Sequence, residues 1–195
     1  MTFSGNHHKK TVLIDVDGVL RDFIGSLSAV YRREYPGHVI KPVDSRKLED
    51  FYPIGRGIYE FMDNTFAREI LEDAPVFPGA VEVLHRWEDT FDIVIATAQP
   101  PEGRYPTLSW LGKHRVPANC IHFTYHKHLL EGFALLDDFT DNLENFAASG
   151  RLAVCFDQPW NRRWKGPRVN TVEEFFQVVM DHIRETEIDG NILLA

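Results

Sequence analysis

Short apolar runs that alternate with helical patterns constrain the fold of this chain more than any other feature. Five of these runs have the length of a β-strand, and each is mostly continuous rather than alternating between apolar and polar residues. They are Thr11–Val16, Asp92–Thr97, Cys120–Thr124, Phe133–Leu136 and Arg151–Phe156. Continuous apolar strands are typical of a parallel sheet, because helices cover both of its faces. We therefore predict a parallel sheet of five strands.

The segments between the runs carry helical spacing or helix-capping signatures. They are Gly79–Trp87, Arg104–Lys113, Asp141–Ala148 and Phe175–Arg184. Asp141 with Glu144, and Thr171 with Glu174, fit the pattern in which an N-cap side chain is followed three residues later by a glutamate. Strands that alternate with helices predict an open α/β sheet with helices on both faces.

One stretch interrupts the alternation. From Asp22 to about Pro75 the sequence shows only helical patterns, at Phe23–Tyr35 and Ile58–Leu71, with proline and glycine loop signals between them. About fifty residues are too many for one crossover helix. We therefore predict a helical lid inserted after the first strand. Residues 10–22 and 76–195 would form the α/β core, and residues 23–75 would form the helical subdomain.

Composition and charge exclude several classes of protein. The chain has 29 acidic and 21 basic residues, which argues against binding duplex nucleic acid through a basic surface. The polar segment Met1–Lys10 lacks the apolar run of a signal peptide, and no apolar run approaches the roughly 20 residues of a membrane span. We therefore expect a cytoplasmic protein without a membrane partner. Cys120 and Cys155 each lie in an apolar stretch, so we expect two buried thiols rather than a disulfide.

Two carboxylates follow the first predicted strand. Asp15 and Asp17 come after an apolar run and precede Gly18, which permits a sharp turn. Ligands of open α/β sheets bind beyond the carboxyl ends of the strands, so both acids should face that crevice. One carboxylate can attack phosphorus while the other transfers protons, and both can take part in binding magnesium. The alternative, that Asp17-Gly18 is only a turn, is weakened by the burial expected at Asp15, since an unpaired buried charge is costly.

Three further strand ends carry groups suited to phosphate chemistry. Thr97 ends the second run and could donate to a phosphate oxygen, while Lys127 follows the third run and could neutralise phosphate charge. Asp137 and Asp138 end the fourth run, where adjacent side chains point to opposite faces. One could bind a metal ion directly while the other orients it or binds through water. Each signal is weak alone, but their order along the chain predicts one site for a phosphomonoester and Mg²⁺.

These four segments resemble the four motifs of the haloacid-dehalogenase (HAD) superfamily, and more narrowly its 5'(3')-deoxyribonucleotidase family. The matching segments are Asp15–Phe23, Phe77–Val81, the ten-residue step from Lys127 to Asp137, Leu135–Asp138, and Phe156–Arg162 followed by Arg168 and Val169. The resemblance implies a HAD-like Rossmannoid three-layer sandwich, with a five-stranded parallel sheet and a small helical cap inserted after the first strand. The first strand would be central, between the strands that end at Thr97 and Asp137.

The resemblance also implies a role for each matching residue. Asp15 would be the nucleophile that forms an aspartyl phosphate, and Asp17 would protonate the leaving alkoxide and then activate water. Thr97 and Lys127 would hold the transferring phosphoryl group. Mg²⁺ would be bound by Asp15, Asp17 and Asp138, with Asp17 contributing its backbone carbonyl and Asp137 in support.

The substrate that the resemblance implies is a nucleoside monophosphate. Phe23 matches an aromatic residue that contacts the nucleobase, and we assign Phe66 and Ala98 to the same pocket. Most other aromatic residues of the insert should form its own core. Ala98, Tyr125 and Phe139 depart from the family pattern, in which animal members have a hydroxyl residue and an arginine at the first two positions and a basic residue is common at the third. Each change removes a polar group near the substrate, which leaves the identity of the substrate open.

Several alternatives stay open. The chain could be a phosphatase of the same superfamily that acts on a sugar phosphate or another small metabolite. A non-catalytic binding module is a further option, although a pure binder does not need the proton transfer assigned to Asp17. His122, His126 and His128 could form a transition-metal site, but surface histidines beside the active-site lysine are the simpler interpretation. Trp160 could close the site or simply pack, and a homodimer is one option for the oligomeric state.

Overall fold

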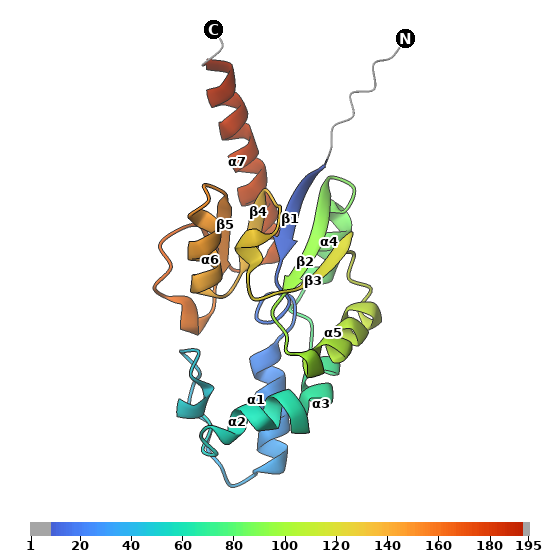
Figure 1. The fold of residues 1–195 in the computed structure, drawn as a ribbon, viewed down its shortest axis with the longest axis vertical. Coiled ribbons are helices and arrows are strands. Elements are labelled where there is room, and N and C mark those ends of the chain that lie inside the picture. Colours follow the sequence, from blue (N-terminus) through green and yellow to red (C-terminus); the bar gives the residue numbers. More distant parts are fainter. Residues whose placement is uncertain (1–8, 193–195) are drawn as a thin grey trace.

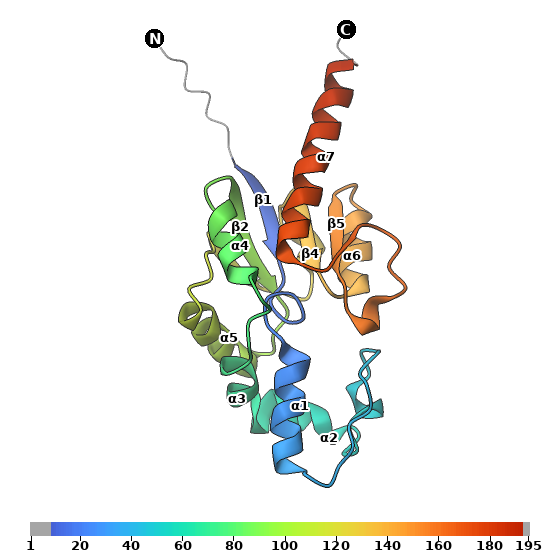
Figure 2. The ribbon, with the colours of Figure 1, turned by 180° about the vertical axis from the view of Figure 1, so that it is seen from behind.

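The central feature of the fold is a parallel β-sheet, shown in Figures 1 and 2 in a computed structural model that describes residues 9–192. Most of the polar N-terminal segment considered above, residues 1–8, lies outside that range. The strands are β1 (Lys10–Ile14), β2 (Phe91–Thr97), β3 (Cys120–Phe123), β4 (Ala134–Asp137), β5 (Leu152–Phe156) and β6 (Arg168–Val169). Their order in the sheet is β3-β2-β1-β4-β5-β6. As predicted, β1 lies at the centre, between β2 and β4.

The prediction of five strands is wrong by one. The sixth strand, β6, has two residues, and it extends the sheet by pairing Arg168 with Cys155 and Val169 with Phe156. A two-residue strand with one charged side chain produces no apolar run, so hydrophobic periodicity does not reveal it.

Helices cover both faces of the sheet. The helices are α4 (Ala80–Trp87), α5 (Pro101–Lys113), α6 (Thr140–Ala147) and α7 (Val172–Ile192). Because side chains alternate along a strand, Val12 and Ile14 of β1 pack in one core cluster with α4, α5 and α7, whereas Leu13 packs in the other with α6. Figure 2 shows α4 and α7 in front of the sheet, and Figure 1 shows α6 on the opposite side. The molecule is therefore a three-layer α/β sandwich.

The two predicted helix caps have different outcomes. The hydroxyl of Thr171 accepts from the backbone N–H of Glu174 (3.1 Å), which confirms the cap before α7. The cap predicted at Asp141 is wrong, because α6 begins at Thr140, and Phe139, two residues before Asp141, occupies the N-cap position. The carboxylate of Asp141 instead forms ion pairs with Arg46 and Arg163, which approach it from outside the helix.

The segment between β1 and α4 forms a helical insert with a core of its own. Its elements are α1 (Phe23–Glu34), η1 (Leu48–Asp50), α2 (Gly57–Glu60), the π-helical turn η2 (Phe61–Thr65) and α3 (Ala67–Glu72). The ring of Tyr31 lies 5.0 Å from that of Tyr52 and 5.5 Å from that of Phe61, between centroids. Figures 1 and 2 show this insert beyond the carboxyl ends of the strands, which is where ligands of open α/β sheets bind.

The two chain connections between the insert and the sandwich run side by side. The backbone N–H of Asp22 donates to the carbonyl of Pro75 (2.9 Å), and that of Phe77 donates to the carbonyl of Leu20 (2.8 Å). We call these paired segments, residues 20–22 and 75–77, the stem. The stem connects the insert to the sandwich at one edge. At its opposite edge, the insert meets the sandwich through side-chain contacts.

The two cysteines lie in different environments. Cys155 is buried in β5, as expected, but Cys120 is exposed, so the prediction of burial is wrong there. The reason is that β3 is an edge strand, and the apolar run that contains Cys120 is covered less completely than the runs at the centre. Both thiols are free. Among the described residues, no helix combines the length and apolarity that crossing a membrane would require.

Candidate active site

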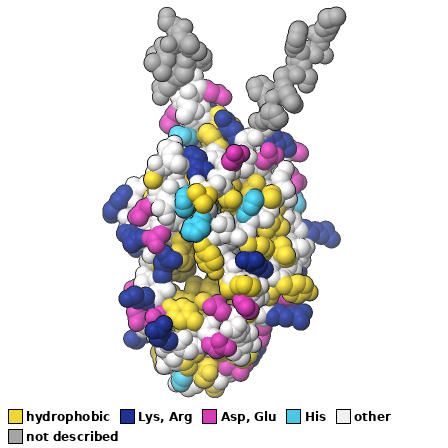
Figure 3. Space-filling model, in the orientation of Figure 1, with side chains coloured by type: hydrophobic (Ala, Val, Ile, Leu, Met, Phe, Trp, Pro, Cys, Tyr) yellow, Lys and Arg dark blue, Asp and Glu magenta, His cyan; other side chains and the backbone are white. Residues whose placement is uncertain are grey.

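A cavity of about 730 Å³ lies between the carboxyl ends of the strands and the helical insert. Figure 3 shows the hollow between these two parts of the molecule. Residues at or after the ends of β1, β2, β3 and β4 form its floor, and the insert forms a wall. The residues of that wall are Phe23, Ile24, Val43, Ser45, Arg46, Leu48, Tyr59, Met62, Asp63, Ala67 and Leu71.

Asp15 lies at the floor, directly after β1. Its side chain is only 8 % exposed, and one carboxylate oxygen accepts from the backbone N–H of Val16 (2.7 Å). The other lies 2.8 Å from Nζ of Lys127. Burial raises the pKa of Asp15 to about 7, against the opposing effect of the Lys127 ammonium. The predicted burial at the strand end is therefore confirmed, and the carboxylate has a charged partner.

Lys127 joins two of the strand-end carboxylates. Its ammonium group lies 2.6 Å from Oδ2 of Asp137 and 2.8 Å from Oδ2 of Asp15, and the side chain is 1 % exposed. Burial alone would lower the pKa of Lys127, but the carboxylates of Asp137 and Asp15 outweigh it and raise this pKa above the usual lysine value. Asp137 also accepts from the backbone N–H of Phe139 (2.7 Å) and from the amide of Asn142. Both oxygens of Asp137 are thus already engaged by protein donors.

Asp138 differs from Asp137 because it keeps one oxygen free. Its Oδ2 accepts from the indole N–H of Trp160 (3.0 Å), whereas the buried Oδ1 has no hydrogen-bond partner among residues 9–192. Burial, with the nearby carboxylates of Asp15 and Asp137, raises the pKa of Asp138 well above its usual value. A side chain at Gly18, whose φ is +76°, would clash with the Asp138 carboxylate. The Asp-x-Asp-Gly turn and the Asp-Asp pair therefore fit together only with glycine at this position.

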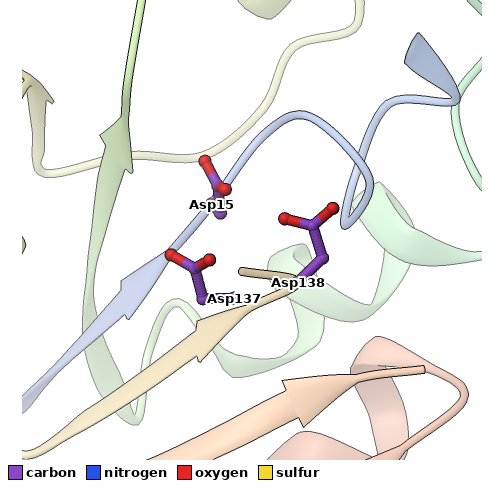
Figure 4. A group of neighbouring side chains, drawn as sticks. All are labelled: Asp15, Asp137 and Asp138. Carbon is purple, nitrogen blue, oxygen red and sulfur yellow. The ribbon is translucent and has the colours of Figure 1, made fainter. Parts of the chain in front are cut away.

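The three buried carboxylates form one cluster. Asp15, Asp137 and Asp138 each offer an oxygen, and the three atoms lie within 4.8 Å of one another. Figure 4 shows the three side chains converging from the ends of β1 and β4. Hard divalent cations such as Mg²⁺ prefer oxygen ligands, and Asp138 of this cluster has an unpartnered oxygen. The residues present therefore fit a Mg²⁺ ion.

Thr97 and Ala98 lie at the end of β2 and line the cavity, as predicted. The hydroxyl of Thr97 is buried and has no hydrogen-bond partner within the described part of the chain. A buried hydroxyl without a partner is costly, so a ligand oxygen that accepted from it would relieve this cost.

Asp17 also lines the cavity, but its carboxylate lies outside the cluster of three. The guanidinium of Arg21 donates to both of its oxygens (2.7 and 3.1 Å), and the amide of Gln99 also donates to it. The side chain remains 23 % exposed. Arg21 and Gln99 are not among the residues predicted from the sequence. The sequence does contain one indication for Arg21. This charged residue directly follows the apolar Val19 and Leu20, and a charge that is buried there needs a partner of opposite charge.

The structure separates the two predicted aromatic contacts. Phe23, the first residue of α1, lines the cavity, and so does Tyr59. Phe66 does not line it. Its ring packs 4.5 Å from the ring of Phe61 within the core of the insert. Trp160 lines the cavity and donates a hydrogen bond to Asp138, so this loop contacts the site rather than only packing beside it.

The three histidines do not form a cluster with metal-site geometry. His126 lines the cavity, and its ring lies 5.9 Å from that of His128. His122 lies beside the thiol of Cys120 (3.3 Å). Within residues 9–192, the side chains whose spacing suits a metal ion are the three aspartates of the cluster, and no histidine belongs to that group.

Comparison with known proteins agrees with this geometry. The family described as "5' nucleotidase, deoxy (Pyrimidine), cytosolic type C protein" matches residues 9–184. A Staphylococcus aureus protein named "Putative 5'(3')-deoxyribonucleotidase" is 26 % identical over 184 residues, which cover 91 % of this chain and 99 % of that protein.

Solved structures share the fold. A haloacid dehalogenase-like hydrolase from Streptococcus pneumoniae superposes with a TM-score of 0.60 at 12 % identity, covering 87 % of this chain and 98 % of that one. A HAD hydrolase from Bacillus subtilis, solved with bound magnesium, gives a TM-score of 0.56 at 13 % identity, covering 88 % and 98 %. The family match extends over the strands that carry every charged residue of the floor. The chain thus belongs to this family of 5'-nucleotidases, is a phosphoric monoester hydrolase, and shares its fold with haloacid dehalogenase-like hydrolases.

Proposed function

We propose that this protein hydrolyses nucleoside monophosphates in a Mg²⁺-dependent reaction that passes through an aspartyl phosphate on Asp15. One observation carries the proposal. The Asp15 carboxylate is buried at the floor of the cavity, paired with Lys127 and next to the free oxygen of Asp138. This arrangement provides a nucleophile, a compensating cation and an unfilled ligand position within one cluster.

In the first step, an oxygen of Asp15 forms a bond to phosphorus as the bond from phosphorus to the ester oxygen breaks. Asp17, on the cavity side of the same loop, gives its proton to the departing alkoxide. In the second step, water attacks phosphorus, Asp17 takes a proton from that water, and the bond to Asp15 breaks. Inorganic phosphate leaves, and both carboxylates return to their starting state.

Lys127 and Thr97 hold the phosphoryl group between these steps. The ammonium of Lys127 restrains Asp15 and offsets negative charge that gathers near the transferring group. The unpartnered hydroxyl of Thr97 donates to a phosphoryl oxygen. Both side chains are fixed by burial before substrate arrives, which limits the reorganisation that the reaction requires.

Asp15, Asp138 and the backbone carbonyl of Asp17 would hold Mg²⁺, with Asp137 in support. The assignment follows from the partners of each side chain, because Asp137 is engaged by Lys127 and Asn142 while Asp138 has a free oxygen. When bound, Mg²⁺ would neutralise charge on the carboxylates and on the phosphate.

The cavity wall supports a nucleotide as substrate. A volume of about 730 Å³ accommodates more than a phosphate group, and Phe23 and Tyr59 provide aromatic faces on which a base could stack. In this proposal residues 23–75 act as a cap that covers the substrate. A sugar phosphate is the second candidate, because the polar Ser45 and Asp63 on the same wall could bind hydroxyl groups.

The test is phosphate release from a panel of esters. We expect release from dTMP, dUMP and other nucleoside 5'- or 3'-monophosphates to exceed release from sugar phosphates, and to stop when EDTA removes Mg²⁺. A preference for sugar phosphates would select the second candidate. Failure to release phosphate from any ester with Mg²⁺ would overturn the proposal and favour a binding function.

A further inference from the structure

Arg21 is a fully buried arginine that the mechanism above does not use. It lies in the stem, and its guanidinium donates to three parts of the molecule. Two N–H groups donate to the Asp17 carboxylate, one donates to the backbone carbonyl of Leu71 (3.0 Å), and one donates to the hydroxyl of Thr107 (3.1 Å). The guanidinium carbon also lies 5.2 Å from the ring centroid of Trp110. A side chain with this many partners has little freedom to move.

The bond to Asp17 fixes the orientation of that carboxylate. A guanidinium that donates to both oxygens defines the plane of a carboxylate as well as its position, which a lysine ammonium cannot do. The amide of Gln99 holds the same carboxylate from the β2 side. Asp17 is partly exposed to the cavity, so without these donors its side chain could adopt other rotamers.

The remaining bonds of Arg21 connect this carboxylate to the insert. Leu71 belongs to α3, the last helix of the insert, and Thr107 belongs to α5, which packs against α3. The neighbouring stem residues are held by the backbone bonds at Asp22 and Phe77. The position of Asp17 is therefore tied through one guanidinium to the helix that joins the insert to the sandwich.

We infer that Arg21 is a positioning residue for proton transfer by Asp17, which it aligns with the leaving oxygen and links to α3 of the insert. This inference rests on the proposed function, since it concerns the step assigned to Asp17. A purely structural role for Arg21 is the alternative, because a buried ion pair at the stem could serve only to join insert and sandwich.

The dependence on the leaving group separates these two roles. An alkoxide must receive a proton as it leaves, whereas p-nitrophenolate leaves without one, and kcat/KM reports the steps up to its departure. For Arg21→Lys, we expect kcat/KM to fall on the order of 100-fold with dTMP and less than about threefold with p-nitrophenyl phosphate. Asp17→Asn should show the same pattern and provides the reference.

The ratio of the two kcat/KM values is the measured quantity, because it does not depend on the fraction of enzyme that is folded. Arg21→Gln, which supplies amide donors without charge, is assayed in parallel. Thr107→Val removes another partner of Arg21 and is the matched control, with a ratio expected to remain at the wild-type value.

Equal losses on both esters, or no loss on dTMP, would overturn the role of Arg21 while leaving the phosphatase proposal intact. A wild-type enzyme that hydrolyses neither ester would overturn both. A changed ratio in Thr107→Val as large as that in Arg21→Lys would also contradict the inference, because the bond to Asp17 would then not be the cause.

Discussion

The floor of the cavity and the wall supplied by the insert are built from different kinds of contact. On the floor, Asp15 and Lys127 are almost completely buried, and ion pairs of 2.8 Å or less join Lys127 to Asp15 and to the buried Asp137. The wall consists mainly of apolar and aromatic side chains, with Arg46 and Asp63 among the few charged ones. Removing one partner of a buried ion pair leaves an uncompensated charge, whereas an apolar wall loses contact area in small increments. The floor should therefore decide whether the reaction occurs, and the wall should decide which ester reacts.

The two regions also meet in different ways at their two edges. At the stem, the buried Arg21 joins them through hydrogen bonds to α3 and α5. At the opposite edge, Arg46 of the insert pairs with Asp141 of α6 (2.6 Å), and its guanidinium lies 4.0 Å from the ring centroid of Phe139. Arg46 and Asp141 are each about half exposed, so this contact is screened by water and salt. The stem should be the fixed edge, and the Arg46 contact the one that opens.

The strongest test of the floor is Asp15→Asn. We expect phosphate release to fall on the order of 10⁴-fold or more, because an amide oxygen is a poor nucleophile toward phosphorus. Steady-state phosphate release measures the change, and the far-ultraviolet circular dichroism spectrum serves as the control for folding. Substantial residual activity in a folded variant would exclude Asp15 as the nucleophile.

Asp138→Asn tests the metal assignment. We expect the Mg²⁺ concentration for half-maximal activity to rise by at least about 100-fold. In the wild-type protein, Mg²⁺ at about 100 times its Kd should raise Tm by about 5–10 °C, and the variant should lose most of this rise. Asp181→Asn, which removes an exposed carboxylate of α7, is the control and should retain it. An equal response in both variants would place the ion elsewhere.

Phe23→Leu tests the wall. If the base stacks on this ring, KM for a nucleoside monophosphate should rise about tenfold with little change in kcat. KM for a small sugar phosphate should not change. Phe66→Leu is the matched control, because Phe66 packs in the core of the insert and is expected to lower stability rather than raise KM. Equal KM values in the two variants would remove Phe23 from the substrate site.

Arg46→Ala tests the edge that is expected to open. We expect KM to rise about two- to fivefold, and the wild-type KM to rise with ionic strength toward that of the variant, since exposed ion pairs are weak and screened. Arg163→Ala, which removes the other partner of Asp141 but not a residue of the cavity wall, should have the smaller effect. A larger effect of Arg163→Ala would show that the charge of Asp141 matters rather than the bridge.

The smallest expected effect concerns His114, the residue that follows α5. Burial lowers the pKa of His114 below its usual value of 6.5, with smaller contributions from Lys113 and Arg21. The neutral imidazole is therefore favoured in the folded protein. The contribution of His114 to the free energy of unfolding is constant above pH 6.5 and decreases as pH falls below 6.5, because the unfolded chain then binds the proton more readily than the folded protein. Urea unfolding between pH 7.5 and 5 should show a shallower loss for His114→Gln than for His85→Gln, an exposed control. Parallel losses would contradict this assignment.

The contrast between floor and wall also explains which predicted residues lie together at the cavity. Asp15, Thr97, Lys127 and Asp138 each follow an apolar run or lie at its end, and the carboxyl ends of parallel strands must meet at one edge of the sheet. Local pattern and one topological rule are sufficient for such residues. Phe66 failed because its placement depends on how the helices of the insert pack, which a helical period does not specify.

Other features depended on contacts between distant segments. The sixth strand forms because the edge of β5 is free to pair with Arg168 and Val169. Asp141 does not cap α6 and instead forms ion pairs with Arg46 and Arg163. Gly18 illustrates both levels. Its place in a turn followed from the sequence, but the need for the space that Asp138 occupies appears only when β1 and β4 lie side by side.

The sequence by itself determined the central parallel sheet, the chemistry at the ends of its strands and the order in which the charged groups follow one another. These features arise from strand periodicity and from the high cost of burying a charge without a partner. Only the tertiary structure decided which partner each charge has. It assigned Lys127 to Asp15 and Asp137 and Trp160 to Asp138, because pairing over such sequence separations depends on the packing of whole elements. Arg21 and Asp17 are only four residues apart, and the turn between them brings the two side chains together.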